Sequence, residues 1–139
     1  MYPFHLAIPV NNLEVARRFY MDVLGCLEGR SDIKWVDLNL FGHQLVIHYK
    51  SGLTKGNVKG HNPVDGHEVP IPHFGVVLDF QEWSLLADRL EKAGIQFIIE
   101  PYVRFKGLAG EQHTMFFLDP SGNALEFKAF KNPDQLFSK

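Results

Sequence analysis

Apolar and polar positions follow one another along the chain in two blocks that repeat the same order of elements. In the first block, an apolar run at Pro3–Pro9 predicts a strand, and apolar residues at helical spacing predict a helix over about 12–24. Period-two alternation predicts strands at Lys34–Leu40 and Gln44–Tyr49, with a weaker strand at Cys26–Ser31. The first block therefore has the order strand, helix, strand, strand, strand.

The second block repeats this order. An apolar run predicts a strand at Ile71–Leu78, and a helix follows over 79–94, with a capping aspartate at its start and a glycine at its end. A strand at Ile95–Glu100 ends at the proline that follows it. Turn residues between Thr114–Leu118 and Ala124–Phe130 predict a closing hairpin.

The chain of 139 residues therefore predicts a single α+β domain, 1–139, built from two βαβββ modules at about 1–50 and 71–130. Residues 51–70 lie between the modules and are rich in glycine, with two prolines. They predict a long irregular loop, which we interpret as a mobile cover or an interface arm.

Two pairs of residues align the modules, although overall identity between them is low. His5 and His73 occupy matching places on the first strand of each module, and Gly42 and Gly122 occupy matching turns before the last strand. The repeat is therefore one of pattern.

Composition excludes several classes of protein. The net charge is -2 and there is no basic cluster, so we expect no nucleic-acid partner. No apolar run is long enough for a membrane span, and the first residues lack the pattern of a signal peptide. One cysteine, Cys26, permits no internal disulfide, which favours a cytoplasmic location.

Three side chains are candidate metal ligands. His5 and His73 interrupt apolar strands at repeat-related positions, and Glu126 lies between Leu125 and Phe127, where an unpaired carboxylate is costly. Two histidines and one carboxylate form the facial triad that leaves open positions on a divalent ion, typically Fe(II). The alternative is that both histidines have ordinary structural roles and that Glu126 faces solvent.

Two motifs resemble those of a known superfamily. The first helix ends in F-Y-x-x-x-L-G at Phe19–Gly25, and the last hairpin reads D-P-x-G-N-x-x-E at Asp119–Glu126. Together they resemble the vicinal oxygen chelate superfamily, which contains glyoxalases, bleomycin resistance proteins and extradiol dioxygenases. The resemblance implies a cupped mixed sheet around a central metal site with His5, His73 and Glu126 as ligands. We also expect a small-molecule substrate and a homodimer.

The choice among members rests on ligand number. Aligning Gly42 with Gly122 puts Val46 opposite Glu126, and valine cannot bind a metal. The resemblance thus favours the three-ligand extradiol pattern over the four-ligand glyoxalase pattern. The phrases Asn62–Gly66 and Val69–Gly75 resemble single-domain proteins described as extradiol-type dioxygenases.

The sequence therefore predicts an Fe(II)-type dioxygenase-like enzyme for a small substrate with vicinal oxygens. Mn, Ni or Zn are alternative metals. A glyoxalase-type lyase or isomerase, a thiol transferase and a non-catalytic, resistance-type binding module are alternative functions.

One departure from the family pattern concerns catalysis. Phe116 and Gly107 stand where ring-cleaving extradiol enzymes carry a tyrosine and a histidine. His48 shares a strand face with Val46 and is a candidate catalytic residue, although it is equally compatible with a solvated strand end. The candidate substrate-binding residues are Gln44, Tyr102, Arg104 and Phe116.

Overall fold

The computed structural model describes residues 1–53 and 60–139 and divides into two compact units. Unit 1 is Met1–Val58 together with the turn Asp119–Asn123, and unit 2 is Lys59–Leu118 together with Ala124–Lys139. Within the described part of the chain, no helix is long and apolar enough to cross a membrane.

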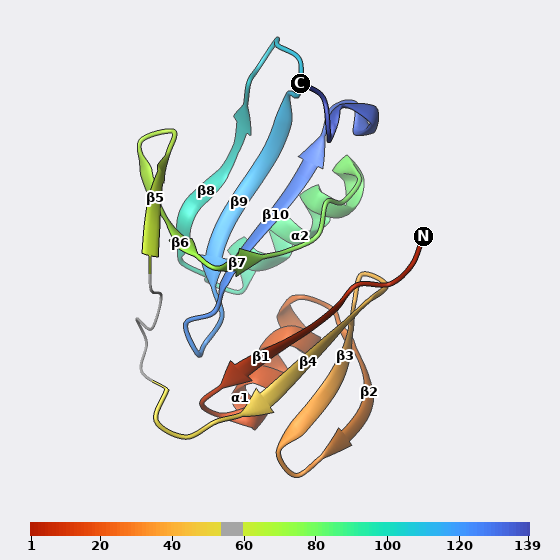
Figure 1. Ribbon diagram of the computed structural model, residues 1–139, viewed down its shortest axis with the longest axis vertical. Helices are drawn as coiled ribbons and strands as arrows, with labels where there is room; N and C mark the ends of the chain where they lie inside the picture. The colour runs from red at the N-terminus through yellow and green to blue at the C-terminus, as the bar shows by residue number, and fades with distance from the viewer. Residues whose placement is uncertain (54–59) are drawn as a thin grey trace. The chain divides into compact units, whose positions relative to one another are not determined.

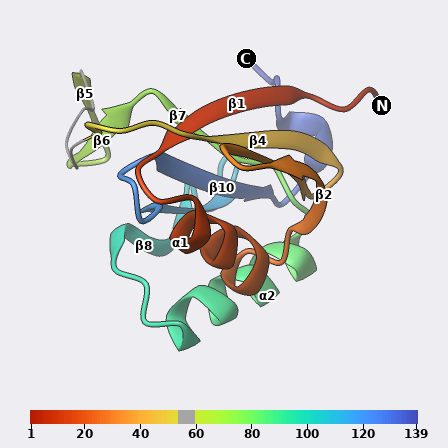
Figure 2. The same cartoon turned by 90° about the horizontal axis from the view of Figure 1, so that it is seen from below.

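Unit 1 is a four-stranded sheet with a short helix on one face (Figures 1 and 2). The strands lie in the order β1-β4-β3-β2, and β1 runs parallel to β4. The helix begins because the Asn12 side chain accepts a hydrogen bond from the Val15 amide. The elements are β1 (His5–Val10), α1 (Leu13–Arg18), the π-helical turn η1 (Phe19–Val23), β2 (Leu27–Asp32), β3 (Trp35–Leu40) and β4 (His43–Tyr49).

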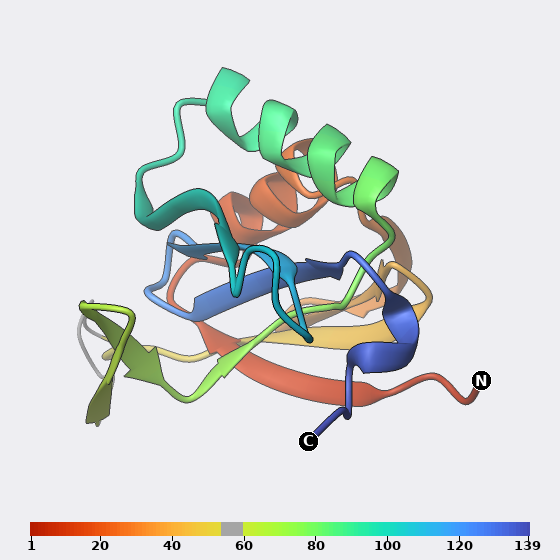
Figure 3. The same ribbon diagram turned by 90° about the horizontal axis from the view of Figure 1, so that it is seen from above.

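Unit 2 has the same design, with strand order β7-β10-β9-β8 and β7 parallel to β10. Helix α2 covers one face of this sheet (Figures 1 and 3), where the Trp83 indole donates a hydrogen bond to the Phe127 carbonyl. The elements are β5 (Gly60–Val64), β6 (His67–Ile71), β7 (His73–Phe74), α2 (Phe80–Lys92), β8 (Phe97–Arg104), β9 (Gln112–Leu118), β10 (Ala124–Phe130) and the 3₁₀ turn η2 (Pro133–Gln135).

The strand register confirms the internal repeat. His5 pairs with Gln44, two residues after Gly42, and His73 pairs with Ala124, two residues after Gly122. Val46 therefore occupies the position in its module that Glu126 occupies in the other, as the alignment of the two glycines predicts.

The predicted strand Ile71–Leu78 is much shorter in the structure. Only His73 and Phe74 form β7, and pairing with β10 resumes as an isolated bridge at Val77. Between them Gly75 lies against the Glu126 backbone, so closely that an added Cβ would stand 1.6 Å from the Glu126 carbonyl oxygen. This close approach needs glycine and brings the β7 strand next to Glu126.

The interpretation of 51–70 as one irregular loop is wrong for residues 60–70. These form the β5–β6 hairpin, whose turn at Asp65 and Gly66 has φ values of 48° and 78°. Positive φ at both turn residues is the type I′ arrangement that Asp-Gly favours. Residues 54–59 of the predicted loop lie outside the described residues, and the role of the segment as a mobile cover or an interface arm stays a prediction.

The predicted end of a strand at Pro101 is also wrong. β8 continues to Arg104, and its pairing with β9 shifts register between Ile99 and Tyr102. β8 lies at the edge of its sheet, where a proline interrupts no second row of hydrogen bonds. The consequence is that Tyr102 and Arg104 lie on a strand.

A buried polar pair lies in unit 1. The Tyr20 hydroxyl is fully buried and donates a 2.8 Å hydrogen bond to the Asp119 carboxylate. Burial, and then the neighbouring Asp119 charge, raises the pKa of Tyr20 well above its usual value. Burial also raises the pKa of the Cys26 thiol to about 12. Both groups thus stay protonated in the folded chain at pH values where they ionise in the unfolded chain.

We therefore expect the thermal stability to fall as the pH rises beyond about 9–10, where these groups begin to ionise in the unfolded chain. Tyr20→Phe removes one of the two groups, so its melting temperature should decline less steeply with pH. At neutral pH the same change should cost about 1–2 kcal/mol through the lost hydrogen bond. Calorimetric scans from pH 7 to 11 measure both effects. Tyr49→Phe, at an exposed tyrosine, should follow the wild-type profile, and an unchanged slope in Tyr20→Phe would contradict the assignment.

Candidate metal centre and ligand pocket

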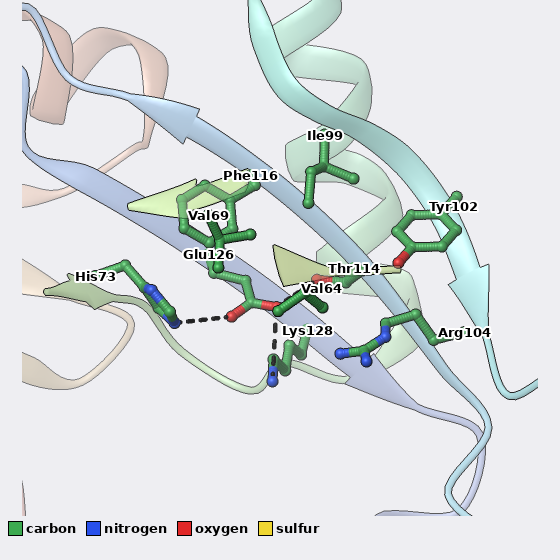
Figure 4. A pocket seen from close by; sticks show the side chains of 10 residues that line it. All are labelled: Val64, Val69, His73, Ile99, Tyr102, Arg104, Thr114, Phe116, Glu126 and Lys128. Atoms are coloured by element: carbon green, nitrogen blue, oxygen red, sulfur yellow. Dashed lines mark hydrogen bonds and ion pairs between the residues drawn. The ribbon is translucent and has the colours of Figure 1, made fainter. Parts of the chain in front are cut away.

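His73 and Glu126 meet on the face of the unit 2 sheet opposite α2. His73 begins β7, and Glu126 lies in the middle of β10, with its side chain 13% exposed. The His73 Nε2 and Glu126 Oε2 atoms are 3.3 Å apart, and Figure 4 shows the imidazole ring directed at the carboxylate. The fold therefore brings together two of the three predicted metal ligands.

The hydrogen bonds of His73 define which nitrogen carries the proton in its neutral form. Nδ1 lies 2.8 Å from the Pro70 carbonyl oxygen, which only accepts, so Nδ1 is assigned as the donor. Nε2 of the neutral ring then presents a lone pair to the Glu126 carboxylate. Two acceptors this close need a proton or a cation between them, and a divalent metal ion meets that need.

The second oxygen of Glu126 is held by two other side chains. The Thr114 hydroxyl donates a 2.8 Å hydrogen bond to Oε1, and Lys128 Nζ lies 3.5 Å from the same atom. Because both partners engage Oε1, Oε2 is the oxygen that faces His73. The carboxylate is thus oriented by its own sheet.

A cavity of about 150 Å³ opens over this group, and all of its lining residues belong to unit 2. Phe116 lies at its base, 2% exposed, with its ring edge-to-face against His73 at 4.9 Å between centroids. Phe116 thus lines the pocket as predicted, but as an apolar wall. The lining residues are Val64, Val69, His73, Ile99, Tyr102, Arg104, Thr114, Phe116, Glu126 and Lys128.

Tyr102 and Arg104 project from β8 into the same cavity (Figure 4). The Tyr102 hydroxyl and Arg104 Nε both donate to Oδ2 of Asp65, each at 2.6 Å. The hydrogen bond from Tyr102 lowers the pKa of Asp65, whereas burial and then the bond to Asp65 raise the pKa of Tyr102 to about 12. At neutral pH, Asp65 is therefore ionised and Tyr102 is a donor.

In unit 1, the Nδ1 atom of His5 lies against an oxygen acceptor, as Nδ1 of His73 does in unit 2. Its Nδ1 lies 2.8 Å from the Gln44 side-chain oxygen, so with that amide assignment Nε2 of the neutral ring is again unprotonated. Gln44 therefore orients a histidine in this structure. His48 is exposed on β4, and Gly107 lies beyond the end of β8, where its amide donates to Glu111.

No group of three or more His, Cys, Asp or Glu side chains is arranged to hold a metal ion among the described residues. Sequence reasoning missed Thr114, Lys128 and Asp65. Lys128 could have been found, because it lies two positions after Glu126 and shares its strand face. Thr114 requires the β9–β10 register, and Asp65 requires the hairpin and its docking.

The comparisons with known proteins agree with this fold. No protein-family model and no curated protein matches the chain. The crystal structure of a glyoxalase/bleomycin resistance protein/dioxygenase from Alicyclobacillus acidocaldarius matches with 32% identity and a TM-score of 0.79, over 98% of this chain and 96% of that one.

Two more distant structures share the fold. A genomically encoded fosfomycin resistance protein from Listeria monocytogenes is 16% identical, with a TM-score of 0.70 over 97% of both chains. A lactoylglutathione lyase from Agrobacterium tumefaciens is 19% identical, with a TM-score of 0.66 over 99% of this chain and 97% of that one. The two βαβββ modules and the 32% identity over almost the whole chain lead to one conclusion: the chain belongs to the glyoxalase/bleomycin resistance protein/dioxygenase family, within the vicinal oxygen chelate superfamily.

Proposed function

We propose that the protein is a metal-dependent enzyme that binds one divalent cation through His5, His73 and Glu126. The observation that carries the proposal is the pair of facing acceptors, His73 Nε2 and Glu126 Oε2, 3.3 Å apart, with Nδ1 of His73 committed to Pro70. In metal-binding histidines, the N–H of the second ring nitrogen commonly donates a hydrogen bond to a carbonyl or carboxylate oxygen in this way.

His5 is the proposed third ligand because its ring has the same arrangement. Its Nδ1 is held by the Gln44 oxygen, which leaves Nε2 as a donor atom for a metal. Val46, at the repeat position of Glu126, offers no fourth donor. A divalent ion with three protein ligands would supply open positions for substrate oxygens and would act as a Lewis acid.

Among family activities, we propose the dioxygenase type with Fe(II), acting on a small substrate with vicinal oxygens. Two histidines and one carboxylate are the ligand set of non-haem Fe(II) oxygenases. A related structure carries the name glyoxalase/dioxygenase, while two others are a lactoylglutathione lyase and a fosfomycin resistance protein. Lyase or thiol-transfer chemistry with Ni, Zn or Mn is therefore the competing outcome.

We also propose that the protein is a homodimer located in the cytoplasm. Light scattering tests the oligomeric state, and cell fractionation tests the location.

The residues of the pocket have separable tasks in this proposal. Thr114 and Lys128 hold Oε1 of Glu126 and so direct Oε2 toward His73. Phe116 and Val69 give the cavity an apolar floor and wall that exclude water. Tyr102 and Arg104 supply hydrogen-bond donors that can orient a polar substrate.

Metal analysis of the full chain, purified without oxygen and without added metal, tests the proposal. About one iron per chain, with oxygen consumed when a substrate with vicinal oxygens is added, would support the Fe(II) oxygenase. Nickel or zinc at that stoichiometry would instead favour lyase or transferase chemistry. If no divalent ion binds after incubation with each metal, the metal-dependent function is wrong.

Simple catechols are expected to be poor substrates of the Fe(II)-loaded protein. Phe116 stands where ring-cleaving relatives carry a phenol, and it is buried against His73. Positioned groups that transfer a proton contribute roughly 10²–10⁴-fold to a rate, and Phe116 offers none. The test supplies catechol and air and follows the yellow ring-cleavage product by absorbance. Turnover of several per second would contradict this role of Phe116.

Thr114→Val is expected to weaken metal binding by about tenfold, because it removes the hydrogen bond that the Thr114 hydroxyl donates to Glu126 Oε1. Thr114→Ser keeps the hydroxyl and should keep the wild-type affinity. Competition with a chelating dye measures both values. Equal affinities in the valine and serine variants would show that the hydroxyl does not position Glu126.

A further inference from the structure

The polar end of the unit 2 pocket already holds a carboxylate that comes from the chain itself. Asp65 lies at the turn of the β5–β6 hairpin, and its Oδ2 accepts from Tyr102 and Arg104, each at 2.6 Å. Tyr102 and Arg104 line the cavity together with Glu126. The donors are thus built into the sheet, while the acceptor is brought by a hairpin turn.

The contact leaves much of the binding capacity of Arg104 unused. Both donors converge on one oxygen of Asp65, and among the described residues Arg104 donates through Nε, while its guanidinium lies over the Phe105 ring at 4.9 Å from the centroid. A guanidinium carries five N–H donors in a fork that matches both oxygens of a carboxylate. The Arg104 side chain is 17% exposed and that of Asp65 is 40% exposed. A free carboxylate that bound the fork with both oxygens would therefore form a stronger contact than Asp65 does.

We propose that Arg104 and Tyr102 form a subsite for a carboxylate group of the substrate, and that Asp65 occupies this subsite when no ligand is bound. The inference rests on the proposed metal-dependent function. It narrows the class of substrates to small carboxylic acids that carry an oxygen on the carbon beside the carboxylate, such as 2-hydroxy and 2-oxo acids.

The size and charge of the pocket agree with this class. A cavity of about 150 Å³ suits a molecule the size of benzene, and such acids with three or four carbons are of that order. Lys128 adds a second cationic side chain to the lining. Because Glu126 and Arg104 line the same cavity, one such molecule can contact the polar end while its second oxygen lies toward Glu126 and His73.

The test measures binding of lactate to the full chain by NMR, following the methyl signal of lactate in every variant and the side-chain Nε–H signal of Arg104 wherever this residue is present. The Arg104→Gln variant assigns this signal by its loss. Asp65→Asn removes the internal charge, and asparagine tolerates the positive φ of this turn. Glu68→Gln is the matched control, because it removes one negative charge from an exposed position of the same hairpin.

Lactate should bind Asp65→Asn about tenfold more tightly than wild type, because a neutral amide competes for Arg104 and Tyr102 less strongly than the Asp65 carboxylate does. Glu68→Gln should keep the wild-type affinity, and Arg104→Gln should lose binding in both the wild-type and the Asp65→Asn background. Tyr102→Phe, a second variant that leaves the hairpin turn intact, should weaken binding severalfold. An unchanged lactate affinity in Asp65→Asn would show that the contact of Asp65 with Tyr102 and Arg104 only stabilises the hairpin. Tighter binding of methylphosphonate than of lactate would overturn the assignment of the subsite to a carboxylate.

These titrations are done on metal-free protein and repeated with zinc, so that the subsite is tested independently of the metal. Loss of the Asp65→Asn effect with normal zinc binding would overturn the subsite and leave the proposed metal function standing. The full effect in a chain that binds no divalent ion would support the subsite and overturn the metal function.

Discussion

Replacing His73 with alanine is expected to lower the affinity of the protein for its divalent ion by more than about 100-fold. The change removes Nε2, which faces Glu126 Oε2 at 3.3 Å, and leaves only two of the three proposed donors. Loss of a residue that merely orients a ligand already costs roughly 10–100-fold in metal affinity, and loss of the ligand itself should cost more. Isothermal titration of the metal-free chain measures the change.

His67→Ala is the control for this experiment, because His67 is an exposed histidine on the neighbouring hairpin. It should retain wild-type affinity and stoichiometry. Full metal occupancy in His73→Ala at the wild-type affinity would show that the ion binds elsewhere, and the proposed function would then lose its central observation.

Gly75→Ala is expected to destabilise the protein by about 3 kcal/mol and to weaken metal binding at the same time. The added Cβ would stand 1.6 Å from the Glu126 carbonyl oxygen and 2.6 Å from the carbonyl carbon, so the β7 and β10 backbones must move apart. Crowding of a packed interior costs about 1–3 kcal/mol and occasionally more. Urea unfolding measures the loss of stability, and a metal titration measures the displacement of Glu126 from His73.

Gly29→Ala provides the matched control, because the same methyl group there would meet its nearest neighbour, the Asp37 Cβ, at an ordinary 3.5 Å. It should change the free energy of unfolding by less than about 0.5 kcal/mol, as is usual for a surface substitution without a special contact. If Gly75→Ala has the same small effect, the strand pair adjusts freely, and the close approach does not position Glu126.

Local signals in the sequence predicted much of the fold. The Asp79 cap marks where α2 begins, and its side chain accepts the hydrogen bond from the Glu82 amide that the pattern predicts. The cap of α1 is Asn12, one residue after the Asn11 that the spacing to Glu14 favours. The turns at Gly42 and Gly122 fix the pairing register, because a strand that leaves a defined turn has its side-chain faces determined. The correspondence of Val46 with Glu126 followed from these turns alone.

Features that depend on contacts between distant strands could not be predicted in this way. Prolines and glycines in 51–70 obscured a hairpin that Asp65 and Gly66 define, since Asp-Gly is a turn signal only when strands flank it. Pro101 is a strand-ending signal in the sequence, because no local pattern shows that β8 lies at a sheet edge. The contact between Asp65 and Arg104 joins residues 39 positions apart and leaves no periodic signal in the sequence.

The assignment of the turn Asp119–Asn123 to unit 1 has a consequence for protein synthesis. Tyr20, Asn11 and Pro9 obtain hydrogen-bond partners from this turn, across 99 to 114 positions of sequence. While only residues 1–58 have emerged from the ribosome, the nascent chain therefore lacks the Asp119 carboxylate, which accepts the hydrogen bond of the buried Tyr20 hydroxyl. Contacts between residues so far apart in the sequence form late, because the entropic cost of closing the long loop between them must be overcome first. Unit 1 therefore completes its native hydrogen bonding only once nearly the whole chain has emerged, so the amino-terminal half should need protection from proteases and aggregation during translation.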